Sequence, residues 1–201
     1  FWRMPFKHGN YSMKKFNKIT HFSYLAVLII LSSFMFTACQ EPAVTLTTPE
    51  SVNGFKLNTF VQIDSYTSVS KNTLNDALNL CDYYENIFSR TKEDSELAKV
   101  NSNQTTSISK ELYELISAGL EYAALSNGAF DITIGSVSSL WDFTAESPKV
   151  PDSDKIAEAL THVDYTKINV TDNGDGTYSI IKPDDVILDL GAVAKGYIAD
   201  K

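Results

Sequence analysis

Polar and apolar residues alternate along residues 59–66, which predicts a β-strand because successive strand side chains point to opposite faces. Residues 73–88 instead repeat apolar side chains at helical spacing, which predicts a long amphipathic helix. Its apolar positions are Leu74, Ala77, Leu78, Cys81, Tyr84, Ile87 and Phe88. A polar loop over residues 89–107 then precedes a second helix, which is capped by Ser109 and extends through Ala123.

The following part of the chain predicts shorter elements. Residues 126–141 are punctuated by glycines, and a short helix is expected near residues 153–160. Two strands, at 167–170 and 178–182, flank the sequence Asp-Asn-Gly-Asp-Gly at 172–176. This sequence is similar to a calcium loop but lacks the ligands at positions nine and twelve, so a hairpin turn is favoured.

A third strand is predicted at 186–190 and leads through Gly191 into a helix that starts at Ala192. The order of elements indicates an α+β fold in which a mixed or antiparallel sheet is layered with helices. The chain stops at Lys201 about two turns into that helix, without a stop signal. We therefore expect a C-terminally truncated domain.

The first 38 residues have the pattern of a targeting segment. They contain five basic residues and no acidic ones, and residues 24–36 are almost entirely apolar. Met13 is the more natural start, so residues 1–12 are interpreted as an extension and residues 13–38 as a signal peptide. Residues 36–39 resemble a bacterial lipobox, which predicts lipidation of Cys39; the alternative is a plain secretory signal.

Residues 39–54 are rich in Thr, Pro, Glu and Ser and are expected to form a tether before a domain at 55–201. Only Cys81 remains in that domain, and its place on the apolar side of a helix predicts a buried thiol.

Charge narrows the classes of partner. The net charge is −8, but beyond the basic first 38 residues there are 12 Lys and Arg against 25 Asp and Glu. Such an acidic domain is a poor candidate for nucleic-acid binding, because phosphates would be repelled. It is compatible with a site that holds divalent cations.

The strongest local signal is Asp-Leu-Gly-Ala-Val-Ala-Lys-Gly at 189–196. A strand ends in Asp189, Gly191 allows a tight turn, and a helix begins with small residues and Lys195. Exposed backbone N–H groups and a lysine at a helix start suit a phosphate-bearing ligand. The alternative is an ordinary strand-to-helix turn with an exposed lysine.

A second signal is Ser-Asn-Gly-Ala-Phe-Asp-Ile-Thr-Ile-Gly at 126–135, followed by Trp141. The backbone between Gly128 and Gly135 is expected to lie close to a flat ligand. Asp131 is an acid in an apolar run, which is costly unless it is paired or bound. The alternative is a helix C-cap at Gly128 followed by a core strand, with Asp131 capping a turn.

A third segment, residues 88–101, has the composition of a solvated loop when it is taken alone. Together with residues 126–141 and 189–196, it resembles the motifs of the ApbE family, the FAD:protein FMN transferases, in order and spacing. Residues 57–63 are similar to that family's first strand. The resemblance covers residues 55–201 as the N-terminal portion of an ApbE-like domain.

The resemblance implies an enzyme that binds FAD and Mg²⁺, transfers FMN to a threonine hydroxyl of an acceptor redox protein, and releases AMP. The residues that it assigns to FAD are Leu57, Thr91, Ala129, Phe130, Asp131, Asp189 and Lys195. The backbone carbonyl of Ala192 is assigned to Mg²⁺, a cation that prefers oxygen ligands. The catalytic residues and further metal ligands are expected beyond Lys201.

The chain differs from the family pattern at four positions. Leu57 and Asn58 replace a methionine and a glycine, Thr91 stands where an aromatic is common, and Ala192 replaces a second glycine. Two other functions stay open: an FAD pyrophosphatase that yields FMN and AMP, and a non-catalytic flavin-binding lipoprotein. With the anchor at Cys39, the expected location is the bacterial cell envelope, lipid-anchored and facing the periplasm or exterior.

Overall fold

The computed structural model describes residues 45–142 and 145–201. The signal peptide predicted at 13–38, the extension at 1–12 and the lipidation site at Cys39 lie outside the described residues. The predicted strand at 59–66 is confirmed as β2 (Thr59–Thr67).

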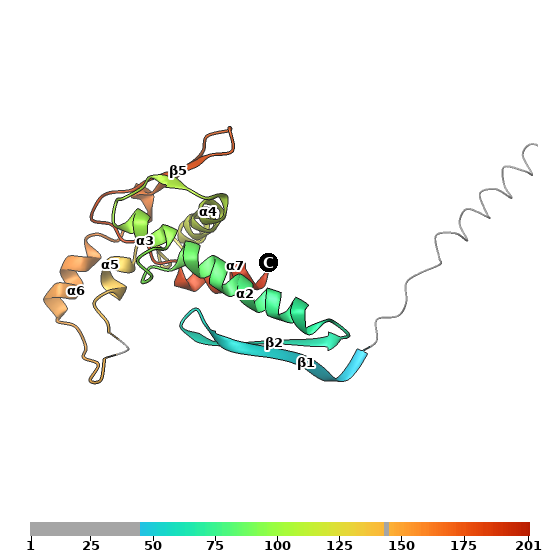
Figure 1. The fold of residues 1–201 in the computed structure, drawn as a ribbon. Helices are drawn as coiled ribbons and strands as arrows, with labels where there is room; N and C mark the ends of the chain where they lie inside the picture. Colours follow the sequence, from blue (N-terminus) through green and yellow to red (C-terminus); the bar gives the residue numbers. More distant parts are fainter. Residues whose placement is uncertain (1–44, 143–144) are drawn as a thin grey trace, which may run out of the picture. The chain divides into compact units, whose positions relative to one another are not determined.

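A β-hairpin replaces most of the predicted tether. β1 (Thr45–Lys56) pairs with β2 in a two-stranded sheet (Figure 1). The tether prediction is therefore wrong from residue 45 to 54. The strand could not be recognised from the sequence pattern, because Val52 is the only buried residue of β1. Val52 packs against Leu74 and Leu78.

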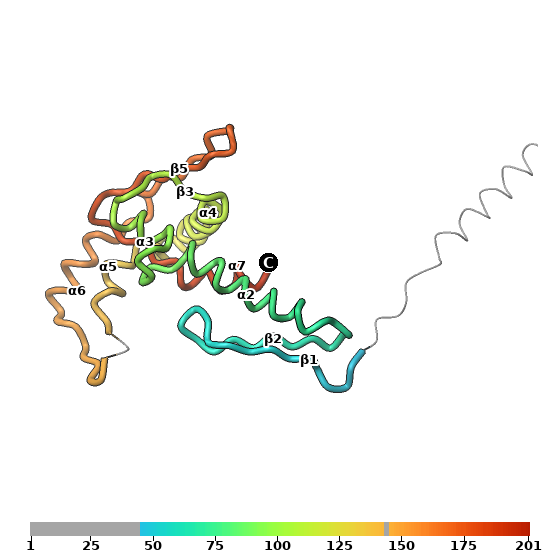
Figure 2. Tube along the Cα trace, in the orientation of Figure 1, coloured from blue at the N-terminus to red at the C-terminus, as the bar shows by residue number. Residues whose placement is uncertain are grey.

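Three helices follow the hairpin. α2 (Lys71–Phe88) runs beside β2, as Figure 2 also shows, and α4 (Lys110–Leu125) begins after the predicted cap, where Ser109 Oγ accepts the Leu112 N–H at 3.2 Å. The predicted loop between them contains a further helix, α3 (Glu96–Asn101). This helix has 6 residues, of which only Leu97 and Val100 are buried. Two apolar positions are too few to show a helical period in the sequence.

A second sheet is antiparallel and has the order β3-β5-β4. Its strands are β3 (Ser107–Ile108), β4 (Asn169–Asp172) and β5 (Tyr178–Ile181). The turn between β4 and β5 has Gly174 and Gly176 at positive φ, and the Gly174 N–H donates to Asp172 Oδ1 at 2.9 Å. The predicted hairpin turn is confirmed, with Asp172 accepting a turn amide.

The remaining elements are short. They are α5 (Gly135–Ser138), α6 (Ser153–Leu160), the 3₁₀ turn η1 (Tyr165–Lys167) and α7 (Gly191–Ala199). The predicted helices near 153–160 and from Ala192 are confirmed. The strand predicted at 186–190 is wrong: it forms only a single parallel bridge, between Ile134 and Ile187. The backbone of Leu188 bonds instead to the side chain of Asn101.

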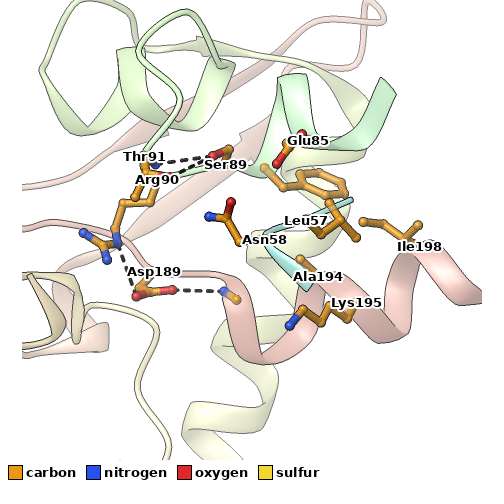
Figure 3. Close-up of a pocket in the computed structure, with 12 residues that line it drawn as sticks. Leu57, Asn58, Glu85, Ser89, Arg90, Thr91, Asp189, Ala194, Lys195 and Ile198 are labelled. Carbon is orange, nitrogen blue, oxygen red and sulfur yellow. Dashed lines mark hydrogen bonds and ion pairs between the residues drawn. The ribbon is translucent and has the colours of Figure 1, made fainter. Parts of the chain in front are cut away.

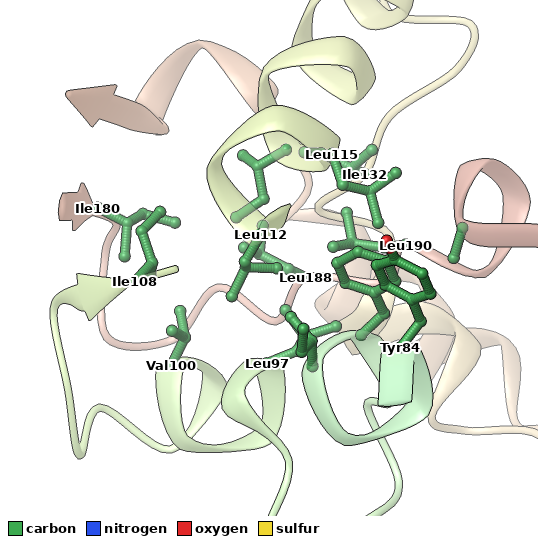
Figure 4. Close-up of a cluster of buried hydrophobic side chains, with 14 of the residues drawn as sticks. Tyr84, Leu97, Val100, Ile108, Leu112, Leu115, Ile132, Ile180, Leu188 and Leu190 are labelled. Atoms are coloured by element: carbon green, nitrogen blue, oxygen red, sulfur yellow. The ribbon is translucent and has the colours of Figure 1, made fainter. Parts of the chain in front are cut away.

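The main core lies between α2, α3, α4, α7 and the segment that precedes α7 (Figure 4). Its most deeply buried side chains include Leu97, Leu112, Leu115, Ile116, Ile132, Leu188 and Leu190. Helices layered with an antiparallel sheet confirm the predicted α+β class. Cys81 is a buried free thiol, as predicted, and burial raises its pKa.

No helix within residues 45–142 and 145–201 is both long enough and apolar enough to span a membrane.

Candidate functional site

A pocket of about 190 Å³ lies where the β1–β2 turn, the C-terminal end of α2 and the start of α7 meet (Figure 3). Apolar side chains form one wall, and charged and polar side chains form the remainder. The lining residues are Leu57, Asn58, Glu85, Phe88, Ser89, Arg90, Thr91, Asp189, Gly191, Ala194, Lys195 and Ile198. We call this the α7 pocket; four residues that the sequence assigned to FAD meet there, namely Leu57, Thr91, Asp189 and Lys195.

The β1–β2 turn places Leu57 at the pocket. Leu57 and Asn58 are its two central residues, with φ of 52° and 54°. Positive φ at both positions suits the right-handed twist of a two-residue hairpin and favours Gly or Asn. Asn58 therefore accepts the conformation that the family's glycine provides, whereas Leu57 carries strain while its side chain packs on the core.

The C-terminal end of α2 places Arg90 and Thr91. Ser89 ends the helix, and its Oγ accepts the N–H groups of Thr91 at 3.3 Å and Lys92 at 3.1 Å. The buried Ser95 hydroxyl donates to the Ser89 carbonyl, so hydrogen bonds of Ser89 and Ser95 hold the loop at its two ends.

Asp189 reaches the pocket on an extended segment that is fixed from two sides. The Asp189 N–H donates to the Ile132 carbonyl at 2.8 Å, and the Gly135 N–H donates to the Ile187 carbonyl at 3.0 Å. Both oxygens of the carboxylate accept hydrogen bonds. Its Oδ1 accepts the Gly191 N–H at 3.0 Å, and its Oδ2 accepts the Ser138 hydroxyl at 2.8 Å.

Arg90 completes the surroundings of this carboxylate. Its Nε lies 3.3 Å from Asp189 Oδ2, and its Nη1 donates to Ser139 Oγ at 2.7 Å. Arg90 could not be recognised from the sequence, because its partner lies 99 positions away and nothing in the local pattern distinguishes it from a solvated loop cation.

The start of α7 offers fewer free amides than the sequence suggested. The N–H groups of Gly191, Val193 and Ala194 already bond to Asp189 or to the Leu190 carbonyl. Within the described part of the chain, Ala192 is the residue of this turn whose N–H has no partner. A phosphate group at this turn would therefore have to be held mainly by a side chain and not by backbone N–H groups.

Lys195 supplies that side chain. It is exposed one turn into α7, and among the described residues its ammonium makes no hydrogen bond or ion pair. The carboxylate of Glu85, on the opposite side of the pocket in Figure 3, likewise has no hydrogen-bond partner in the described ranges, and this residue was not predicted from the sequence. The α7 pocket thus suits a ligand with an anionic group near Lys195 and a planar or apolar group against Leu57 and Phe88.

The other face of α7 lines a second, larger pocket of about 840 Å³, formed with α4. Two predicted site residues, Phe130 and Ala192, lie there and not in the α7 pocket. The half-buried Tyr197 also lines it, and burial together with the Glu114 carboxylate raises the pKa of its hydroxyl. The predicted FAD contacts therefore fall on both faces of one helix.

Ala129 and Asp131 line neither pocket. Ala129 is exposed in the turn after α4, where Asn127 and Gly128 have positive φ and the Gly128 N–H donates to the Ala123 carbonyl. Asp131 Oδ1 accepts from the Thr133 N–H and hydroxyl at 2.8 and 2.6 Å, and Oδ2 accepts the Tyr165 N–H at 2.9 Å. This carboxylate caps a turn, which was the alternative interpretation of the pattern; its contact with FAD stays a prediction.

The described residues do not by themselves form a magnesium site. No group of three or more His, Cys, Asp or Glu side chains gathers anywhere in residues 45–142 and 145–201. The Ala192 carbonyl is an oxygen of the kind that Mg²⁺ accepts, but Mg²⁺ needs an octahedral set of ligands.

Comparison with known proteins gives a consistent result. A family model described as the ApbE family matches residues 57–201. The FAD:protein FMN transferase of Treponema pallidum is 32% identical over 135 residues, which cover 64% of this chain and 37% of that protein. The FAD:protein FMN transferase of Escherichia coli K12 is 26% identical over 193 residues, which cover 89% of this chain and 54% of that protein.

Solved structures agree in fold. The ApbE protein of Thermotoga maritima superposes with a TM-score of 0.66 and 33% identity, over 76% of this chain and 50% of that one. The flavin transferase ApbE of Vibrio cholerae gives a TM-score of 0.63 at 23% identity, which shows the fold alone. The chain spans about half the length of these structures. Its match to the Treponema pallidum protein covers 37% of that protein's length.

Proposed function

The chain belongs to the ApbE family, and on that premise we propose that the protein transfers FMN from FAD to a threonine hydroxyl of an acceptor protein. In this reaction the hydroxyl oxygen forms a new bond to the FMN phosphorus. The bond between that phosphorus and the bridging oxygen breaks, AMP leaves, and the hydroxyl proton passes to solvent or to a base. FAD is the substrate, and a redox protein is the acceptor.

The observation that carries the proposal is the Lys195 ammonium, which has no partner among the described residues and lies beside an apolar wall at the start of α7. A lysine placed in this way attracts the diphosphate, whose charge must be balanced during phosphoryl transfer. Leu57 and Phe88 provide surface for a ring. The contacts expected of FAD lie on both faces of α7, so a ligand that reaches them all must pass the N-terminal turn of that helix.

Magnesium is part of the proposal through the family resemblance. Mg²⁺ would neutralise charge on the diphosphate, and Ala192 would supply one oxygen ligand. The residues of this chain would bind and orient the nucleotide.

The proposed location is the bacterial cell envelope. The basic residues before the apolar run at 24–36, and the cysteine after it, support a lipid anchor at Cys39. An enzyme anchored in this way would face the periplasm or exterior and would be close to membrane-bound redox acceptors. Metabolic labelling with a fatty acid would test the anchor, and a Cys39→Ser variant that still carried label would contradict it.

Transfer is tested by incubating the protein with FAD, Mg²⁺ and a candidate acceptor. The expected result is a fluorescent flavin band on the acceptor that survives denaturing electrophoresis and is absent when the metal is chelated. An acceptor whose threonine is replaced by alanine should stay unlabelled. Release of FMN and AMP without labelled protein would contradict the proposal and favour the pyrophosphatase, and binding of unchanged FAD would favour a flavin-binding protein.

A further inference from the structure

The Asp189 carboxylate lines the pocket in which an anionic ligand is expected. It accepts the first N–H of α7 and lies in the same pocket as Lys195 (Figure 3). A bare carboxylate at this point would repel a diphosphate and would offset the attraction of Lys195. The site therefore needs a cationic group that neutralises Asp189.

Arg90 has the position and charge for that task. Its Nε lies 3.3 Å from Asp189 Oδ2, and about a quarter of each side chain is exposed, so water screens the pair only in part. Its Nη1 donates to Ser139 Oγ at 2.7 Å, and that hydroxyl donates in turn to the Gly135 carbonyl at 2.6 Å. The guanidinium is thus held by Ser139, the residue that ends the one-turn helix α5.

The arrangement also fixes the direction of the carboxylate. Ser138 from α5 and Arg90 from the loop after α2 both bind Oδ2, which leaves Oδ1 for the Gly191 N–H. Two segments far apart in the sequence, α5 and the loop after α2, therefore set the start of α7 through the Asp189 side chain.

We propose that Arg90 is a positioning residue that acts through Asp189: it neutralises and orients this carboxylate so that the diphosphate of FAD can approach α7 and Lys195. This role rests on the proposed function, because it presupposes an FAD-like ligand in the α7 pocket. Arg90 is not required to touch the ligand.

The test is a double-mutant cycle read out by FAD binding, measured by calorimetry with the metal chelated so that no turnover occurs. Arg90→Gln should weaken FAD binding at least tenfold, and Arg90→Lys should recover part of the loss. In an Asp189→Asn background, Arg90→Gln should cost less than threefold, because no carboxylate remains to be neutralised. Riboflavin, which lacks phosphates, should bind Arg90→Gln and the unsubstituted protein within threefold of each other.

Two results would overturn the inference: FAD binding by Arg90→Gln equal to that of the unsubstituted protein, or the same loss in the Asp189→Asn background. Weaker riboflavin binding by Arg90→Gln, equal to the loss for FAD, would also do so, because it would indicate a general disturbance of the pocket. Thermal unfolding of each variant detects such a disturbance independently. If the unsubstituted protein binds no FAD, the proposed function fails first, so the two failures are distinguishable.

Discussion

The side chain of Asn101 pairs with the backbone of Leu188 in the way that a neighbouring strand would. Its Nδ2 donates to the Leu188 carbonyl at 2.9 Å, and its Oδ1 accepts the Leu188 N–H at 2.8 Å. Leu188 is completely buried, so water cannot replace either bond. The side-chain amide of Asn101, at the end of α3, thus satisfies the backbone N–H and carbonyl of Leu188, the residue directly before Asp189.

Replacing Asn101 with Ala should therefore destabilise the fold. The substitution leaves a buried N–H and a buried carbonyl without partners, which we expect to lower the free energy of unfolding by about 2–4 kcal/mol. Urea denaturation measures the change. Asn79→Ala is the control, since Asn79 is exposed on α2, has no side-chain hydrogen bond in the described ranges, and its loss should cost no more than about 0.5 kcal/mol. Equal stability of the two variants would show that the Asn101 pairing is dispensable.

Gly135→Ala should also be destabilising, for a steric reason. A Cβ at Gly135 would lie 2.4 Å from the Ile187 carbonyl oxygen, a backbone atom that cannot move without the segment before Asp189. We expect a loss of at least about 2 kcal/mol, in the range of overpacked cores. Gly196→Ala is the matched control: no atom lies within 4 Å of the added carbon, and alanine in a helix should stabilise by up to about 1 kcal/mol. A neutral Gly135→Ala would mean that the Ile134–Ile187 bridge is not tightly held.

The elements with a strong local period could be predicted from the sequence. The apolar repeat of α2, the Ser109 cap of α4 and the glycine-rich turn between β4 and β5 all depend on neighbouring residues, and all are confirmed. β1 could not be predicted, because its strand character comes from pairing with β2 and from a single buried valine. The prediction of a strand at 186–190 was wrong for a related reason. The hydrogen-bond partner of Leu188 is the side chain of Asn101 and not a neighbouring strand.

The candidate site shows the same division. Motif order brought attention to Leu57, Thr91, Asp189 and Lys195, which do meet in one pocket. It gave no information on Arg90, because an ion pair between residues 99 positions apart leaves no periodic trace. Nor did it show that Phe130 and Ala192 line the second pocket, on the other side of α7. Which residues line which pocket depends on how the helix is rotated against its neighbours.

The hydrogen bond between Tyr197 and Glu114 should make stability depend on pH. The Tyr197 hydroxyl donates to Glu114 Oε2 at 2.7 Å and is the main cause that lowers the pKa of this glutamate. A lowered pKa means that the stabilisation is present above the usual glutamate range and is lost as pH falls through the lowered value. Tyr197→Phe should therefore cost about 1 kcal/mol at neutral pH and progressively less in acid.

Unfolding free energies of the two proteins between pH 7 and pH 2 measure this difference. Tyr122→Phe is the control, because Tyr122 is exposed and its hydroxyl has no hydrogen-bond partner in the described ranges. A Tyr197→Phe deficit that stayed constant down to pH 2 would indicate lost packing instead of the carboxylate interaction.

Lys195→Ala should weaken FAD binding about tenfold or more, because a hydrogen bond to a charged group is worth roughly 1.5–3 kcal/mol and about 1.4 kcal/mol corresponds to a factor of ten. The effect should be smaller at high salt, since ions screen an exposed ammonium from the diphosphate. Lys155→Ala removes the same charge from the exposed face of α6, away from both pockets, and should leave affinity unchanged. Calorimetric titration with FAD at two ionic strengths measures both variants. Equal affinity of Lys195→Ala and Lys155→Ala would refute the role of Lys195, whereas a loss confined to low salt supports direct attraction between this lysine and the diphosphate.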